Sequence, residues 1–295
     1  MFRNLRVRKP IERSVPEPGA LALDRLAQDS TTPLNLRQVN ALPANARTRV
    51  YRALLPPALL TRFGIDPIGW KGADGEPRIQ LAIASDSGGV SLAARNSTDS
   101  DDDFLRIELV DNAFNSIDLR LLLLNDPDSP RFRTDIDAAG RPTLFGTARR
   151  NLTEEARAAQ SGLAPAQIRK SLGASRSVLD HLEAFLLALG QRAYFLEPLT
   201  YASAWVFERR GFAYVRGHKL MDDIHKEFQP GGRLHQTLDG STPFRRPDQW
   251  RTVTGRAWAI HDGILAAIDA EWDGLRMVKQ IGRHAGVETF PNAVY

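Results

Sequence analysis

The spacing of apolar side chains predicts a helix, a strand and a second helix in the last half of the chain. Residues 175–189 place apolar side chains three and four positions apart, as in a helix with one buried face, and Gly190 ends this segment. Residues 193–197 are almost wholly apolar, as expected of a short buried strand. A second helix over 201–209 follows Thr200, whose hydroxyl can cap its first turn. The pattern therefore predicts two helices that flank one buried strand.

The region before this unit alternates apolar and polar side chains with the period of two that is typical of strands. We predict two strands joined by a turn over 80–94, and further strands at 104–110 and 117–124. Residues 131–147 predict another hairpin, with Gly140 at its tip. Strands joined by short turns pair in antiparallel fashion, so this half predicts a mainly antiparallel sheet.

Helical spacing also occurs on both sides of the predicted strands. Residues 47–63 show it before and after Pro56-Pro57, which predicts two short helices that meet at a bend. Residues 151–160 fit a helix capped by Asn151. Residues 166–172 predict a further helical turn or two.

The end of the second helix carries residues 207–212, Phe-Glu-Arg-Arg-Gly-Phe. This segment resembles the Tyr-Glu-Lys-x-Gly-Phe box of the GCN5-related N-acetyltransferases (the GNAT superfamily). Members of that family transfer an acyl group from acyl-CoA to an amine. The resemblance covers about the last third of a GNAT core. It implies an α/β fold with a mixed, mainly antiparallel central sheet flanked by helices.

The loop before the first helix is the place where the resemblance predicts a CoA pyrophosphate. The best register assigns the family's loop positions to Lys170, Gly173 and Ser175. Backbone N–H groups at a helix N-terminus attract phosphate, glycine allows close approach, and a serine can cap the helix. Arg169 and Arg176 surround the same turn and suit the phosphates of CoA. An ordinary capped helix with a solvated basic rim is the alternative interpretation.

Thr200 stands where the family often has Asn at the start of the second helix, and the resemblance adds it to the predicted CoA-binding residues. Two departures from the family bear on catalysis. Many GNAT enzymes have a Tyr that protonates the leaving CoA thiolate, and the matching residue here is Phe207, which has no proton to give. In addition, about twenty residues separate Thr147 from Lys170, where the family usually passes directly into the loop. Direct transfer from thioester to amine is thus expected, with no catalytic residue assigned.

Composition sets the class of protein. Of the 295 residues, 42% are hydrophobic and 25% charged, which is typical of an ordinary soluble protein. The absence of cysteine excludes disulfides, thiolate zinc sites and cysteine nucleophiles, and fits a reducing cytoplasm. No apolar stretch follows the basic residues 1–10, and runs such as 121–124 are too short to span a bilayer. High Ala, Arg and Leu usage suggests a bacterial genome rich in GC.

Charge is distributed unevenly around a net value of +4. Residues 139–295, which contain the predicted loop, carry 21 basic and 16 acidic side chains, as a polyanionic co-substrate favours. Residues 1–60 carry 10 basic and 4 acidic side chains, so association with nucleic acid is a weaker alternative. That arm lacks an aromatic platform or a recognition helix, which argues against nucleic acid.

Two polar clusters contain side chains of the kinds that bind metal ions. Asp99, Asp101, Asp102 and Asp103 lack the ligand spacing and glycine turn of a calcium loop and predict a solvated, flexible loop. The second cluster spreads over 218–235 without any zinc or facial-triad spacing. We therefore predict no metal. A histidine of the second cluster, or its Glu227, is a candidate base on the substrate side.

We divide the chain into an extended arm at 1–45, a GNAT-like core at 46–220 and an extension at 221–295. The arm contains five prolines, and only residues 20–28 could form a short helix there. The extension holds three of the five tryptophans among turn-forming residues, which indicates a small packed unit or a homodimer contact.

The leading function is acyl-CoA-dependent N-acyltransfer to a small-molecule or peptide amine, with acetyl-CoA or another acyl-CoA as co-substrate. The alternative is a catalytically lapsed GNAT-like protein that binds a ligand or partner through the extension. No P-loop, dinucleotide fingerprint or serine-hydrolase elbow is present in the sequence.

Overall fold

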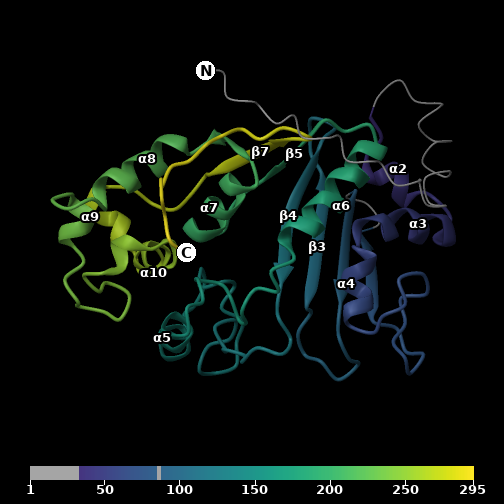
Figure 1. Ribbon diagram of the computed structural model, residues 1–295, viewed down its shortest axis with the longest axis horizontal. Helices are drawn as coiled ribbons and strands as arrows, with labels where there is room; N and C mark the ends of the chain where they lie inside the picture. The colour runs from purple at the N-terminus through teal and green to yellow at the C-terminus, as the bar shows by residue number, and fades with distance from the viewer. Residues whose placement is uncertain (1–32, 85–87) are drawn as a thin grey trace, which may run out of the picture.

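The computed structural model describes residues 33–84 and 88–295. Within these ranges the chain is an α/β protein with one open, seven-stranded and mostly antiparallel sheet flanked by helices (Figure 1). The strand order is β1-β2-β3-β4-β5-β7-β6. The strands are β1 (Ile79–Ala84), β2 (Gly89–Ala94), β3 (Leu105–Asp111), β4 (Ile117–Leu124), β5 (Ala193–Leu196), β6 (Ala213–Arg216) and β7 (Arg276–Gln280).

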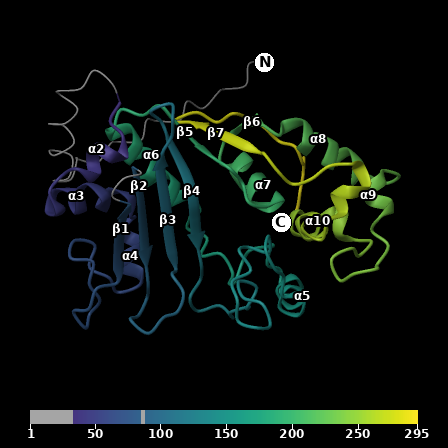
Figure 2. The same ribbon diagram turned by 180° about the vertical axis from the view of Figure 1, so that it is seen from behind.

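The first four strands form an antiparallel meander, as the alternating sequence predicts. Leu105, Ile107 and Leu109 of β3 are buried, whereas Arg106 and Glu108 lie on the other face and are partly exposed. Helix α6 (Ser175–Ala188) and the N-terminal helices cover the buried face (Figures 1 and 2). The short N-terminal helices are α2 (Leu36–Asn40), α3 (Ala44–Tyr51), η1 (Arg52–Leu54) and α4 (Pro57–Arg62).

The predicted bend at Pro56-Pro57 is confirmed. Helix α3 and η1 end before Pro56, and α4 begins at Pro57, where proline is tolerated because the first helical N–H has no partner in the helix. The arm predicted at 1–45 and its helix at 20–28 lie mostly or wholly outside the described residues. Residues 36–40 of that arm form α2, whose first turn is capped by a capping box between Asn35 and Gln38.

The middle of the sheet is a crossover from β4 through α6 to β5. The two strands are parallel and pair over three residue pairs, from Ile117–Tyr194 to Leu119–Leu196. Beyond these pairs the strands diverge (Figures 1 and 2). Arg120 is an extra residue in β4, because Leu119 and Leu121 pair with the adjacent residues Leu109 and Glu108 of β3.

The C-terminal half of the sheet depends on a strand from the end of the chain. Strand β7 lies between β5 and β6, so residues assigned to the extension contribute to the central sheet. Arg276 of β7 bonds Asp118 of β4 at 2.8 Å and Glu197 after β5 at 3.0 Å. This arginine therefore links the parallel strands where they pair.

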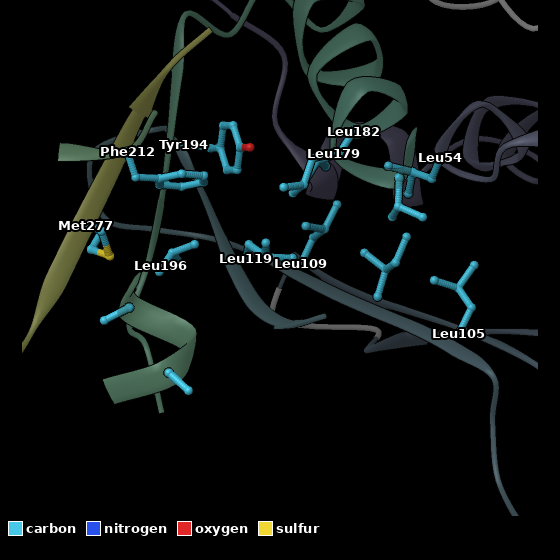
Figure 3. Close-up of a cluster of buried hydrophobic side chains, with 14 of the residues drawn as sticks. Leu54, Leu105, Leu109, Leu119, Leu179, Leu182, Tyr194, Leu196, Phe212 and Met277 are labelled. Atoms are coloured by element: carbon cyan, nitrogen blue, oxygen red, sulfur yellow. The ribbon is translucent and has the colours of Figure 1, made fainter. Parts of the chain in front are cut away.

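The core under this junction is continuous from β3 to the end of the sheet. Figure 3 shows Leu109, Leu119, Leu179, Tyr194 and Phe212 of that core side by side. The rings of Tyr194 and Phe212 meet edge to face, with centroids 5.3 Å apart. The same buried cluster includes residues of the N-terminal helices and of the C-terminal segment, so the hydrophobic core does not stop at the predicted domain boundaries.

The predicted helix–strand–helix unit is confirmed. Helix α6 ends at Ala188, and Leu189 and Gly190 follow it. Helix α7 (Tyr201–Arg209) begins after Thr200, whose hydroxyl accepts the Ser203 N–H. The predicted cap of α6 is wrong: Ala174 is the N-cap and makes no side-chain cap bond, and Ser175 is the first helical residue. Ser175 instead accepts a bond from Arg210.

The segment between β4 and α6 differs most from its prediction. Helix α5 (Leu152–Gln160) is confirmed, with Asn151 accepting the Glu154 N–H. The hairpin predicted over 131–147 is wrong, because only the isolated bridge between Ile136 and Pro142 forms there. The helix predicted at 166–172 is wrong too: this stretch runs beside the residues after β4, with Asp126 N–H bonded to the Lys170 carbonyl.

This inserted segment, residues 126–172, meets the end of β4 through the Leu172 N–H, which bonds the Leu124 carbonyl, and also packs against the C-terminal part of the chain. Trp258 of α10 (Val253–His261) stacks on Phe244 and donates its indole N–H to the Leu163 carbonyl at 2.7 Å. Phe132, Ala158, Leu163, Phe244 and Trp258 form a second buried cluster. The remaining helices of this part are α8 (His218–Glu227), α9 (Arg233–Gln236), η2 (Gln249–Arg251) and η3 (Ile264–Ile268).

The acidic cluster is also corrected, because part of it is buried and paired. Asp103 is 8% exposed and bonds both Arg95 and Arg106. Asp102 bonds Arg131 at 2.9 Å and Arg169 at 3.0 Å. These aspartates anchor the loop and the inserted segment, and they do not lie in a freely solvated loop.

Candidate functional site

A cavity of about 500 Å³ lies where β4 and β5 diverge. Its walls come from the second half of β4, the first turn of α6, helix α7 and the inserted segment. The apolar lining residues are Leu121, Leu122, Leu123, Leu124, Phe145, Ala164, Pro165, Ala166, Ile168, Leu179, Leu199, Ala202, Val206 and Phe207. The polar lining residues are Asn125, Thr134, Asp135, Gln167, Ser171, Ser175, Thr200, Ser203, Arg210 and Tyr295.

The position of this cavity follows from the crossover. Strand β5 ends at Leu196, so the edge of β4 that pairs with it at 117–119 has no strand partner at residues 120–123 among the described residues. The four leucines 121–124 are all half-buried and line the cavity. Ligands of α/β proteins commonly bind beyond the carboxyl ends of diverging parallel strands.

Most polar side chains of the lining already have partners within the protein. Asn125 donates to the Asp103 carbonyl at 3.0 Å, and Thr134 donates to the Gln167 carbonyl at 3.1 Å. Asp135 accepts two bonds from Arg131. Their hydrogen-bonding capacity serves the fold, so they leave the cavity walls with little unmet polarity.

Arg210 is the exception in the lining. It is the C-cap of α7, and its Nη2 donates to Ser175 Oγ at 2.9 Å. Its Nε is buried and has no hydrogen-bond partner. Four other buried donors in the described ranges lack a partner, in Arg47, Arg52, Trp70 and Arg256, and none of them lines this cavity.

The Arg210 guanidinium lies at the start of α6, where the helix leaves its first N–H groups without intrahelical partners. Because Ala174 supplies no cap, those groups and Arg210 favour negative charge at the same place. An anionic group of a ligand would be stabilised at this end of the cavity.

The structure brings together only two of the six residues predicted to bind CoA. Ser175 and Thr200 both line the cavity. Lys170, Gly173 and Arg176 are exposed around the turn before α6 and do not line it. Gly173 has a φ of 74°, so the turn requires the conformation that glycine adopts without strain.

The Arg169 guanidinium bonds groups of the protein itself. Its Nε bonds Asp102 at 3.0 Å, and its Nη1 donates to the carbonyls of Pro127 and Ser129. These contacts hold the inserted segment against the loop after β2, and Arg169 does not line the large cavity.

Two aromatic side chains of the lining differ in what they offer to a ligand. Phe207 packs on Phe212 with ring centroids 5.0 Å apart, so it offers only a hydrocarbon surface to the cavity. Tyr295 brings a phenol to the same cavity and packs on Trp205. Partial burial raises the pKa of Tyr295, so its hydroxyl is protonated at neutral pH.

The candidate base positions lie elsewhere. His225 contacts Arg256, and burial followed by that neighbouring charge lowers its pKa. Glu227 accepts the Arg233 N–H, and neither His225 nor Glu227 lines the cavity. In the described ranges no three His, Asp or Glu side chains come close enough to hold a metal ion.

Sequence reasoning missed Arg210, Tyr295 and the wall from the inserted segment. Arg210 lies inside the 207–212 box, but periodicity alone does not show that it reaches back to Ser175. Tyr295 is separated from α7 by 85 residues of chain, and no local pattern marks it.

Comparison with protein-family models, with curated proteins and with solved structures finds no match. No helix in the part of the chain that the structure describes is long and apolar enough to cross a membrane.

Proposed function

We propose that this protein is an acyl-CoA-dependent N-acyltransferase whose active site is the cavity between β4 and β5. The observation that carries the proposal is the parallel pairing of these strands over three residue pairs, followed by divergence around a cavity. The resemblance of residues 207–212 to the GNAT box supports an acyl-CoA as the ligand of this cavity. The unpaired β4 edge at 120–123 would offer backbone groups to a pantetheine arm.

The anionic part of the co-substrate would lie at the start of α6. Arg210 and the uncapped N–H groups of that helix supply positive charge there. Lys170 and Arg176 are exposed beside the turn and would meet phosphates that project out of the cavity. Thr200 and Ser203 bond each other in the capping box of α7, so they would form part of the cavity wall without donating hydrogen bonds to the co-substrate.

The reaction is a direct acyl transfer. The nitrogen of an amine attacks the thioester carbonyl carbon, the carbon–sulfur bond breaks, and the sulfur leaves as the CoA thiolate. The attacking nitrogen loses one proton and the thiolate gains one, so the products are an amide and CoA. Holding both substrates in one cavity supplies much of the rate enhancement.

Tyr295 is the candidate donor of the proton to the thiolate. It lines the cavity that Phe207 also lines, and its phenol is protonated at neutral pH because its pKa is raised. Phe207 fills the position of the usual acid without a proton to give. The acid would thus come from the end of the chain and not from α7.

Titration calorimetry of the full chain with CoA and with acyl-CoAs tests the binding site. Arg210→Met should weaken binding about tenfold to a hundredfold, because hydrogen bonds to charged groups contribute roughly 1.5–3 kcal/mol. The neighbouring Arg209→Met is the matched control, since Arg209 is 60% exposed and pairs with Glu288. Absence of binding by CoA and by every acyl-CoA would refute the proposal.

A ligand-binding protein without catalysis is the second candidate, and Phe207 favours it. Incubation with an acyl-CoA and a mixture of amines, followed by mass spectrometry for amides and free CoA, separates the two. Binding without amide formation for any amine class would favour the non-catalytic role.

A further inference from the structure

The cavity is built for a hydrocarbon chain longer than acetyl. Its volume of about 500 Å³ falls in the range of about 300–1,000 Å³ that accommodates whole small ligands. Beyond the pantetheine arm that every acyl-CoA shares, acetyl-CoA would bring only one methyl group to these walls. The walls provided by β4, α7 and the inserted segment are mainly aliphatic and aromatic.

Most polar side chains that line the cavity form hydrogen bonds within the protein and leave few groups to bind a polar ligand. Asn125, Thr134 and Asp135 bond groups of the protein itself. Gln167 accepts the Ala164 N–H at 2.7 Å, and Ser203 donates to the Thr200 carbonyl at 2.8 Å. A ligand with many polar groups would lose its hydration at these walls without replacing it, whereas a hydrocarbon would lose nothing.

The one buried donor left over in the lining is Nε of Arg210, at the α6 end. The charge and the hydrocarbon surface are therefore segregated within one cavity. That arrangement matches a molecule with an anionic portion and a long apolar tail.

The rim of the cavity is apolar as well. Phe145, Leu199 and Tyr295 line the cavity and are still 43%, 49% and 48% exposed. Leu144 and Phe145 have φ values of 50° and 59°, a conformation that costs non-glycine residues of order 1–3 kcal/mol each. The surrounding structure must offset this cost, and in this backbone conformation Phe145 lines the cavity.

We infer that the acyl group carried by the co-substrate is a medium or long aliphatic chain, and that β4, Val206 and Phe145 form its binding surface. This inference rests on the proposed function, because it names the acyl donor of the same site. Its consequence is that affinity rises with chain length: each buried methylene strengthens binding about fourfold, so three give about sixtyfold.

The test is calorimetric titration of the full chain with CoA, acetyl-CoA, octanoyl-CoA and dodecanoyl-CoA. Octanoyl-CoA should bind at least tenfold more tightly than acetyl-CoA. Equal affinity for all three acyl-CoAs would overturn the inference and leave the proposed function standing. Failure of CoA and all acyl-CoAs to bind would refute the proposed function, and with it the inference.

Two variants test where the acyl chain binds. Val206→Trp fills the cavity from α7 and should remove the gain from octanoyl to dodecanoyl while acetyl-CoA still binds. Val215→Trp is the control, because Val215 is 57% exposed on β6 and does not line the cavity. Phe145→Ser provides a second test if Val206→Trp does not fold, because the Phe145 side chain lines the cavity and is 43% exposed. Unchanged chain-length preference in folded Val206→Trp and Phe145→Ser would overturn the assignment.

Discussion

Arg210 donates from the C-cap of α7 to Ser175 Oγ in the first turn of α6, over 2.9 Å. The bond joins the two helices that flank β5 and holds the guanidinium in the wall of the cavity. Ser175 therefore positions a cation instead of capping its own helix.

Replacing Ser175 by Ala should separate the positioning of Arg210 from its charge. We expect a loss of stability of about 1 kcal/mol, since one hydrogen bond is removed at a partly exposed site. CoA affinity should fall less than in Arg210→Met, because the cation remains. Urea denaturation and calorimetry measure the two effects. A loss of affinity as large as that of Arg210→Met would contradict a positioning role.

Asp102 should contribute stability that depends on pH. Burial alone would raise its pKa, but hydrogen bonds from Arg131 and Arg169 outweigh burial and hold the pKa below its usual value. A carboxyl whose pKa is lowered by folding stabilises the protein above its unfolded pKa of 3.8, and this contribution is lost as the pH falls through the folded pKa.

Asp102→Asn should destabilise the protein by roughly 1.5–3 kcal/mol at neutral pH, because Arg131 and Arg169 lose their charged bonds to Asp102 but keep those to Asp135 and to the Pro127 and Ser129 carbonyls. Urea unfolding at pH 7 and in steps below pH 4 should show the difference between wild type and variant shrinking with acidity. Asp99→Asn is the control, since Asp99 belongs to the same loop and is exposed. A difference that stays constant with pH would argue against the ion pairs.

Substitutions at Gly146 and Gly140 test how closely the backbone next to Phe145 approaches His261. Both have positive φ, 83° and 76°, so alanine is strained at either position and costs about 1 kcal/mol. At Gly146 a Cβ would also lie 2.4 Å from Cε1 of His261, whereas at Gly140 nothing lies within 4 Å.

Gly146→Ala should therefore be more destabilising than Gly140→Ala, and it alone should weaken binding of a long-chain acyl-CoA. Thermal unfolding and calorimetry provide the comparison. Equal effects of the two substitutions would show that His261 yields without cost.

Trp258 should hold the inserted segment in place. It stacks on Phe244 and bonds the Leu163 carbonyl, so Trp258→Ala removes both contacts and leaves a cavity, at a cost of about 3–5 kcal/mol. Limited proteolysis should then cut within residues 126–172 faster than in the wild type. Leu152→Ala, at a side chain 56% exposed, should leave the cleavage rate unchanged. Protection that persists in folded Trp258→Ala would mean that other contacts hold the segment.

Tyr295→Phe should lower the rate of amide formation and leave acyl-CoA affinity within about twofold. A general acid contributes typically 10²–10⁴-fold, and the benzene ring keeps the contact with Trp205. Steady-state rates, followed by release of CoA, measure the change. An unaltered rate would show that the thiolate leaves without help from this phenol.

Much of the local structure could be predicted because it depends on neighbours in sequence. The apolar period of 175–189, Gly190 and the Thr200 cap are sufficient for the two helices, and alternation is sufficient for β1 to β4. The failures are informative. Residues 131–147 alternate like strands, yet they bond α5 and the segment 166–172, so their backbone groups find partners without a sheet.

By itself, the sequence determined strands β1 to β5, helices α5 to α7 and a mainly antiparallel sheet, because periodicity, caps and turns act over a few residues. Only the tertiary structure decided the site. Placement of β7 between β5 and β6, Arg210 on Ser175 and Tyr295 in the cavity all join residues far apart in the chain. Such contacts depend on how the whole core packs, and a one-dimensional pattern carries no record of which distant side chains meet.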